Sequence, residues 1–226
     1  SFGLSSSVSS FANIGYRDSN GEWKAMGTGC NNSVNAILVH PDGSVYAGGA
    51  FTSAGGVGAT SYIAKWNGSV WTSVGGGLNN TVFALAVGPD GAVYLGGSFT
   101  DAGGVANADR LAKWNGTSYS ALGSGINNIV RAVAVGLDGS VYIGGDFTNL
   151  TDANGNYISK WNGSAWVSLG SGMNGRVNAI AIGPDGTVYA GGAFTLAGGI
   201  ANTAYIAKWD GSVWSPLSTG VSGEIL

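Results

Sequence analysis

The sequence predicts an all-β fold, a five-bladed β-propeller in which each blade is a four-stranded antiparallel sheet. The first observation is a repeat: units begin at Asn31, Asn79, Asn127 and Asn174, spaced by 48, 48 and 47 residues. A period of about 40 to 50 residues is typical of propellers and solenoid arrays. The second is composition, with 44% hydrophobic and 11% aromatic residues and 42 glycines at recurring offsets. This much apolar material indicates a folded core rather than a disordered Gly-rich chain.

The second unit shows how one blade is built. Val82 to Val87 is an apolar run with the length of a buried strand, and a Pro-Asp-Gly turn leads into a second strand at Ala92 to Gly97. A longer loop reaches a third strand at Arg110 to Trp114. Asn115-Gly116 then predicts a type I′ hairpin turn into a fourth strand, Ser118 to Leu122. Four such strands form a propeller blade, whereas β-helix coils are usually shorter and lack paired hairpin turns.

The repeats divide one domain, residues 1–226, into four full units and one split unit. The full units cover about 31–78, 79–126, 127–173 and 174–220, and the fifth blade combines 1–30 with 221–226. Asn13 through Gly27 matches the third and fourth strands of a unit, while Val221 to Leu226 matches the start of a first strand. We therefore expect pairing of the N- and C-terminal segments to close the ring.

The fifth blade lacks residues equivalent to Ala84 through Gly97, about 14 in all. Three explanations stay open: the N-terminal segment folds into this place, another chain donates the strands, or the chain is a fragment of a longer array. We favour closure by the termini, with the N-terminal segment of the same or a neighbouring subunit filling the place. The residues expected to close or assemble the ring are Phe2, Leu4, Val8, Ile225 and Leu226.

Particular motifs carry a family resemblance. A glycine pair ends each second strand (Gly48-Gly49, Gly96-Gly97, Gly144-Gly145, Gly191-Gly192), and an aromatic third strand and a Trp-bearing fourth strand follow. This pattern resembles the kelch-type repeat. The run GG-x-FT-x-AGG followed by IAKWNGS-x-W is more closely similar to Rax2-like and galactose-oxidase-like propellers of cell-surface and secreted proteins. The loop after the glycine pair is longer than in kelch repeats. Such a resemblance implies fold strongly and function weakly.

Catalytic chemistry finds little support in the side chains. One cysteine, Cys30, and one histidine, His40, cannot form a disulfide, a histidine metal cluster or the copper centre of galactose oxidase. Cys30 occupies an apolar slot of the repeat, and His40 stands where other units have glycine. Four of the twelve acidic residues lie in the repeated turn, where Asp caps its own backbone. Only Glu224 lies near a first strand, so a glycosidase carboxylate pair has no support from spacing. We predict no catalytic residue and no cofactor.

A metal site has one weak candidate. Asp152, Asn154 and Asn156 place oxygen atoms at alternate positions around a glycine, as calcium loops do, but the distal bidentate Glu of an EF-hand is missing. A polar surface loop is the favoured interpretation.

Charge and hydropathy limit the classes of partner. Charged residues are 9% of the chain, the net charge is −3, and no basic stretch could neutralise phosphates, which argues against nucleic acid. No run of about 18 apolar residues predicts a membrane span. Few lysines and many Ser, Thr, Asn and Gly suggest an extracellular or cell-surface protein.

Aromatic and variable positions supply the binding hypotheses. Trp66, Trp114, Trp161 and Trp209 are equivalent, and repeated aromatics can form glycan sites, although packing between blades explains such repetition more often. Positions that differ between copies escape that explanation. The slot at the start of the first strand holds Asn35, Phe83, Arg131, Asn178 and Leu226, and we expect it at one mouth of the central channel.

The sequence therefore favours a non-enzymatic extracellular propeller for adhesion or surface recognition of a glycan or protein. The alternative is a structural subunit whose copies assemble into a filament or surface layer by exchanging terminal strands. Glycoside hydrolysis ranks below both.

Overall fold

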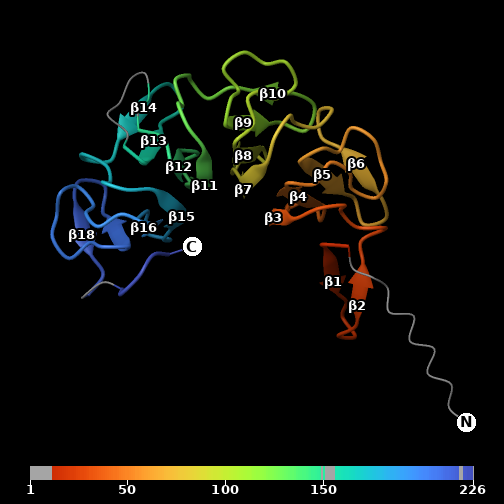
Figure 1. Ribbon diagram of the computed structural model, residues 1–226, viewed down its shortest axis with the longest axis horizontal. Coiled ribbons are helices and arrows are strands. Elements are labelled where there is room, and N and C mark those ends of the chain that lie inside the picture. Colours follow the sequence, from red (N-terminus) through yellow and green to blue (C-terminus); the bar gives the residue numbers. More distant parts are fainter. Residues whose placement is uncertain (1–11, 149, 151–155, 219–220, 226) are drawn as a thin grey trace, which may run out of the picture.

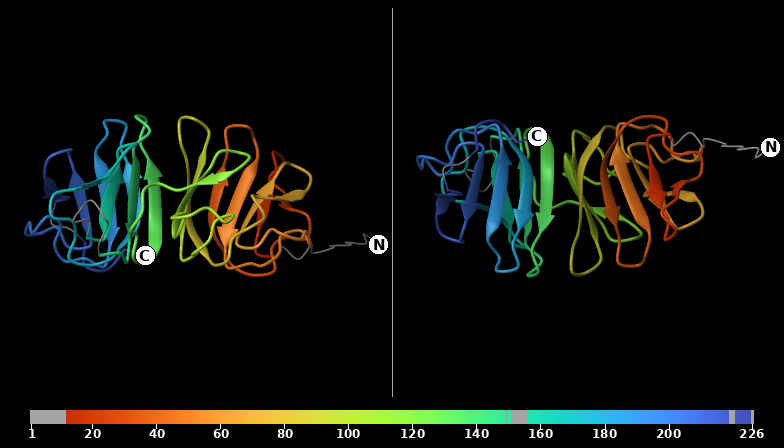
Figure 2. Two further views of the ribbon diagram at one scale, coloured as in Figure 1. Left: turned by 90° about the horizontal axis from the view of Figure 1, so that it is seen from above. Right: turned by 90° about the horizontal axis from the view of Figure 1, so that it is seen from below.

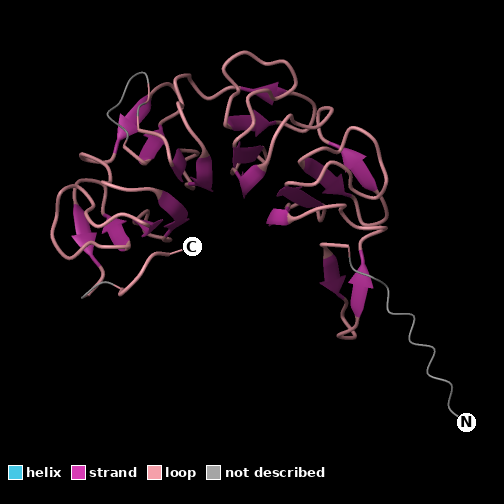
Figure 3. Cartoon of the chain, viewed as in Figure 1, coloured by secondary structure: helices cyan, strands magenta, loops and turns pink. Residues whose placement is uncertain are grey.

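The structure, a computed structural model, describes residues 12–148, 150, 156–218 and 221–225. Within these residues the chain forms strands, turns and loops, with no helix (Figure 3). The strands pair into five antiparallel sheets, four of four strands and one of two. The predicted all-β, five-bladed propeller architecture is confirmed.

The sheets stand side by side in an arc, with their innermost strands at the centre (Figures 1 and 2). The two-stranded sheet consists of β1 (Gly15–Arg17) and β2 (Trp23–Ala25). The four-stranded sheets are β3 (Val34–Val39), β4 (Val45–Gly49), β5 (Ile63–Trp66) and β6 (Trp71–Ser73); β7 (Val82–Val87), β8 (Val93–Gly97), β9 (Leu111–Trp114) and β10 (Tyr119–Ser120); β11 (Val130–Val135), β12 (Val141–Gly145), β13 (Ile158–Trp161) and β14 (Trp166–Ser168); and β15 (Val177–Ile182), β16 (Val188–Gly192), β17 (Ile206–Trp209) and β18 (Trp214–Pro216).

The hairpin between the third and fourth strands differs from its prediction. A type I′ turn needs a positive φ at both central residues, but only the glycine of each Asn-Gly pair has one, as at Gly68 (103°) and Gly116 (98°). The carboxamide oxygen of Asn67 instead accepts hydrogen bonds from the Ser69 and Val70 amides, both at 3.0 Å. The predicted type I′ turn is wrong because the Asn side chain stabilises a different turn, as Asn commonly does.

The Asp of the turn after each first strand behaves as predicted. In the first full sheet, Asp42 accepts a hydrogen bond from the Ser44 amide at 2.8 Å, and the other three sheets repeat this bond. Across the sheet, Lys65 forms an ion pair with Asp42 at 3.1 Å and lies over the ring of Tyr46. Lys113 and Lys160 form the same ion pair with Asp90 and Asp138, so in these three sheets the lysine connects the third strand to the turn.

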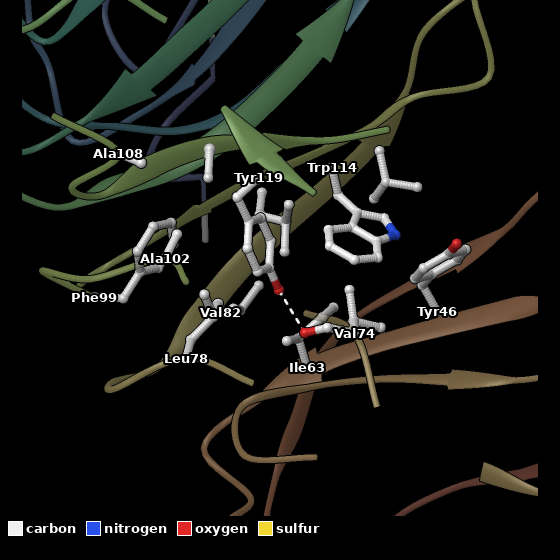
Figure 4. Packing of buried hydrophobic residues seen from close by; sticks show 13 residues of the cluster. Tyr46, Ile63, Val74, Leu78, Val82, Phe99, Ala102, Ala108, Trp114 and Tyr119 are labelled. Carbon is white, nitrogen blue, oxygen red and sulfur yellow. Dashed lines mark hydrogen bonds between the residues drawn. The ribbon is translucent and has the colours of Figure 1, made fainter. Parts of the chain in front are cut away.

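Glycine makes the contact between neighbouring sheets possible. A Cβ placed on Gly48 would lie 2.5 Å from the Val82 side chain of the next sheet, and one on Gly144 would lie 2.5 Å from Val177. Only glycine lets the backbones approach this closely. Figure 4 shows the resulting core between the first two full sheets, where the Tyr119 hydroxyl donates to the Val74 carbonyl at 2.8 Å.

The β1–β2 hairpin is the outer half of the fifth blade. Non-glycine residues with positive φ are uncommon, yet one precedes the third strand of every full sheet, at Tyr62, Arg110, Tyr157 and Tyr205. Asn13 has the same conformation before β1, so β1 corresponds to a third strand. The hairpin packs against the β3–β6 sheet, since Trp71 Nε1 donates to the Met26 carbonyl at 2.7 Å. In the same way, Nε1 of the equivalent Trp214 donates a hydrogen bond to the Leu169 carbonyl of the preceding sheet at 2.8 Å.

The start of the fifth blade lies at the opposite end of the arc. Ile225 packs on Gly191 as Val82 packs on Gly48, and its amide donates to the Gly192 carbonyl at 3.3 Å. Figure 1 shows the β1–β2 hairpin and the C-terminal segment at the two ends of the arc. Within the residues described here, no strand pairing joins them, so the predicted closure of the ring by the terminal segments is not observed in the single chain.

Candidate functional site at the mouth of the central channel

The variable residues of the first strands converge on one cavity. Asn35, Phe83, Arg131 and Asn178 come from four different sheets, and all four line a cavity of about 400 Å³ together with Arg176 and Glu224. This is the arrangement expected at one mouth of the channel. Leu226, the fifth member of the slot, lies outside the described residues.

A backbone irregularity places these side chains. The register of the first strand on the second shifts between Val34 and Ala36, so that Asn35 is the extra residue of a β-bulge. The same shift surrounds Phe83, Arg131 and Asn178. A bulge bends its strand and redirects a side chain. The repeat thus presents one side chain per sheet to the channel mouth, and its backbone tolerates Asn, Phe or Arg at that position.

One side of the mouth is built around Arg131. Its Nε and Nη2 atoms lie 2.9 and 2.8 Å from Asp146 Oδ2, and its guanidinium carbon lies 5.6 Å from the centre of the Phe83 ring. The Arg131 side chain is 28% exposed and that of Asp146 22%, so solvent screens the pair only in part. Phe83 and Asp146 together hold the guanidinium in one orientation.

The other side is built around Glu224. Its Oε1 accepts hydrogen bonds from Arg176 Nη2 at 2.6 Å and from Asn178 Nδ2 at 3.0 Å. These bonds, the Arg176 bond foremost, hold the pKa of Glu224 below its usual value. Asn178 Nδ2 also donates to the Ile225 carbonyl at 2.7 Å, which ties the C-terminal segment to β15.

The mouth therefore presents two arginines, two carboxylates and two carboxamides with no net charge. The second carboxylate oxygens of Asp146 and Glu224 and the Arg131 Nη1 atom are not used in the bonds described above. Such a mixture of donors and acceptors matches a polar, uncharged ligand with several hydroxyl or amide groups.

The sequence did not lead us to predict three residues of this network as part of a ligand site: Asp146, Arg176 and Glu224. The signal was available, because their slots also vary between copies. Asp146 stands where other units have Ala50, Ser98 and Ala193, and Arg176 stands where they have Ser33, Thr81 and Ile129. The predicted site residues came from the slot of Asn35 alone, although residues that flank the first and second strands also reach the mouth.

The four third-strand tryptophans lie away from the mouth, in the packing of the sheets. Each forms an aromatic pair with the fourth strand of its own sheet, with ring centres 5.4 Å apart for Trp66 and Trp71 and 4.8 Å apart for Trp114 and Tyr119. Trp66 and Trp114 are buried, whereas Trp161 and Trp209 are partly buried. Trp161 lines a cavity of about 410 Å³ between the second and third full sheets. A role in glycan contact stays a prediction, with Trp161 the best placed of the four.

The remaining candidate residues either have a structural role or lie outside the described residues. Cys30 is 1% exposed, and burial raises the pKa of its thiol to about 11, so it behaves as the predicted small apolar residue. His40 Nε2 lies 2.8 Å from the Gly91 carbonyl of the next sheet. Phe2, Leu4, Val8, Asp152 and Asn154 lie outside the described residues, and the Asn156 carbonyl accepts the Met173 amide at 3.0 Å. In the described part of the chain, no group of three or more His, Cys, Asp and Glu residues is placed to hold a metal ion.

Known proteins resemble the chain in fold alone. No protein-family model matches the sequence, and no curated protein matches it. Among solved structures, U3-55K superposes with a TM-score of 0.56 at 15% identity over 87% of this chain and 55% of that one. The WD40 repeats of RRP9 give 0.52 at 14% identity over 80% and 49%. Virginiamycin B lyase from Staphylococcus aureus gives 0.55 at 13% identity over 92% and 64%.

These similarities show a β-propeller fold with four-stranded blades. The chain spans about half the length of the RRP9 and U3-55K chains it matches. No helix in the described residues is both long and apolar enough to cross a membrane.

Proposed function

We propose that this protein is a non-enzymatic, extracellular recognition propeller of the kelch-type or Rax2-like kind, which binds a surface glycan or protein at the channel mouth. The observation that carries the proposal is the convergence of the variable repeat positions on one cavity. Residues that only maintain the fold need not differ between sheets. A single asymmetric ligand, in contrast, requires different side chains around the ring.

The chemistry of the mouth favours a glycan over a charged ligand. Its two arginines are paired with carboxylates, so the mouth has no net positive charge to attract a phosphate or carboxylate ligand. Sugar hydroxyls can instead bond to the remaining oxygens and to Arg131 without changing the charge balance.

The state of the Glu224 carboxylate supports a non-enzymatic role. A glycosidase needs one carboxyl that stays protonated near neutral pH, which a raised pKa provides. The pKa of Glu224 is instead lowered by Arg176 and Asn178.

Glycan-array screening of the whole protein, followed by calorimetric titration of the hits, tests the proposal. Asn35→Ala and Arg131→Met should each weaken binding at least tenfold, because both remove polar groups from the mouth. Leu137→Ser is the matched control: Leu137 is 89% exposed beyond the opposite end of β11, so affinity should not change. A hit bound equally by all three variants would place recognition elsewhere.

The second candidate, a structural subunit assembled through its ends, is favoured by the exposure of Trp23. This residue is 64% exposed, whereas its counterpart Trp214 is 2% exposed. Light scattering across a wide concentration range tests it. Growth of particle mass that Trp23→Ser abolishes is the expected result, and a strictly monomeric particle at high concentration contradicts it.

A further inference from the structure

The sheet next to the β1–β2 hairpin exposes apolar side chains on its innermost strand. Ile37 is 57% and Val39 69% exposed. At the equivalent position of the third full sheet, Val133 is only 8% exposed. The corresponding pairs of the second and fourth sheets, Leu85 with Val87 and Ile180 with Ile182, are at most partly exposed. The residue types are alike, so the difference comes from what covers them.

The three complete interfaces show what covers this face. In each, a glycine near the end of one second strand lies against two apolar residues of the next first strand. Gly48 faces Val82 and Leu85, Gly96 faces Val130 and Val133, and Gly144 faces Val177 and Ile180. The same geometry at the β3–β6 sheet requires a glycine-bearing second strand against Val34 and Ile37.

The backbone beside this face is also available. In each full sheet the third strand pairs with both the second and the fourth strand, as β5 pairs with β4 and β6. Among the described residues, β1 pairs with β2 alone. An unpaired strand edge is a template for strand addition. The β1 edge and the exposed face border one apolar groove of about 360 Å³, which we call the hairpin groove, lined chiefly by Ile14, Tyr16, Met26, Ile37, Val39 and Trp66.

We propose that the hairpin groove binds a β-hairpin of the chain's own repeat type, presented by a different polypeptide and not by a second copy of this chain. The second strand of that hairpin pairs with β1, and its first strand lies at the channel. Its penultimate glycine packs on Val34 and Ile37. Main-chain bonds give this strand addition affinity, and the pocketed side chains give specificity. The proposal does not depend on ligand binding at the channel mouth, which lies at Asn35 and uses other residues.

A peptide that reproduces Ala84–Gly97 is the direct probe, because those residues form the corresponding hairpin of the second full sheet. With a short lysine tag for solubility, it should bind the whole protein saturably in calorimetric titration and raise the melting temperature. A peptide of the same composition in scrambled order should do neither. Failure of the native-order peptide to bind overturns the proposal.

Two substitutions in the protein and one in the peptide locate the bound peptide. Ile37→Asp should weaken binding at least tenfold, whereas Val70→Asp should not, since Val70 is 54% exposed at the β5–β6 turn of the same sheet. In the peptide, Gly96→Val should also abolish binding, because a side chain there would meet Val34; this change leaves the protein itself untouched. Binding that tolerates either Ile37→Asp or the peptide Gly96→Val contradicts the proposed geometry. Self-association through Ile37 that the peptide cannot displace would show that a second copy covers the groove and would overturn the proposal.

Discussion

The β1–β2 hairpin and the outer strands of a full sheet share a repeat pattern but not an environment. Trp214 is 2% exposed and bonded to the preceding sheet, whereas Trp23, in the same slot, is 64% exposed. On the inner strands, Ile37 is exposed while Val133 is buried. Burial in a repeat array therefore depends on the neighbouring sheet, because each sheet supplies only one side of each interface.

The largest expected effect tests this comparison at the fourth strand. Trp214→Ala should lower the free energy of unfolding by about 4 kcal/mol, because it removes a large buried side chain and leaves a cavity. Trp23→Ala should cost less than about 1 kcal/mol, since the ring is mainly solvated. Urea unfolding followed by circular dichroism measures both. Equal losses would show that Trp23 is buried in solution.

A smaller effect is expected from crowding between the sheets. Gly144→Ala should cost about 3 kcal/mol, because the new Cβ would lie 2.5 Å from Val177 Cγ1 in a packed interface. Gly58→Ala is the control: no atom lies within 4 Å of a Cβ there, and its stability should change by no more than about 0.5 kcal/mol. Urea midpoints of the two variants give the difference. A tolerated Gly144→Ala would mean that the interface is looser than the structure shows.

The inner strands offer a third comparison. Leu85→Ala should cost about 2 kcal/mol because Leu85 packs on Gly48 and the core beside it. Ile37→Ala should cost well under about 1 kcal/mol, since its side chain lacks the matching sheet. Thermal unfolding of both variants at equal concentration tests the contrast. A large cost at Ile37 would show that this face is covered in solution.

The smallest expected effect is the loss of stability at acidic pH, which should be alike in the β1–β2 hairpin and in the full sheets. Hydrogen bonds hold the pKa of Asp138 and Asp185 below the usual 3.8, and bonds from the Glu22 and Asn20 amides do the same for Asp18 in the hairpin. A lowered folded-state pKa contributes stability above the unfolded value and loses it as pH falls through the folded value. Unfolding free energy should thus be flat from neutral pH to about pH 5 and fall below about pH 4.

Asp185→Asn keeps the oxygen that accepts the Thr187 amide and removes the titrating group. The variant should therefore lose less stability on acidification than the parent, measured by urea unfolding at both ends of the range. An identical acid response of parent and variant would exclude Asp185 as a contributor.

Much of the fold was predictable because repeats report packing directly. The glycine pair, the turn aspartate and the apolar slot of Cys30 were all assigned correctly from their recurrence. The Asn-Gly turn was assigned wrongly. Local geometry decides whether the turn adopts two positive φ angles or is stabilised by a hydrogen bond to the Asn side chain. At the channel mouth, variation identified Asn35, Phe83, Arg131 and Asn178. Asp146 and Arg176 were not predicted, because comparing one repeat position between copies does not show which side chains form ion pairs across strands.

The sequence by itself determined the blade: its four strands, its turns and the glycines that let one sheet approach the next, because each copy repeats the same local chemistry. Tertiary structure alone decided which copies are covered. Ile37 and Leu85 are equivalent in sequence, but among the residues that the structure describes only Leu85 has a preceding second strand beside it. The tertiary structure also placed four charged residues at one mouth of the channel: Arg131, Asp146, Arg176 and Glu224. Their ion pairs form between side chains that the arc, and not the chain order, brings together.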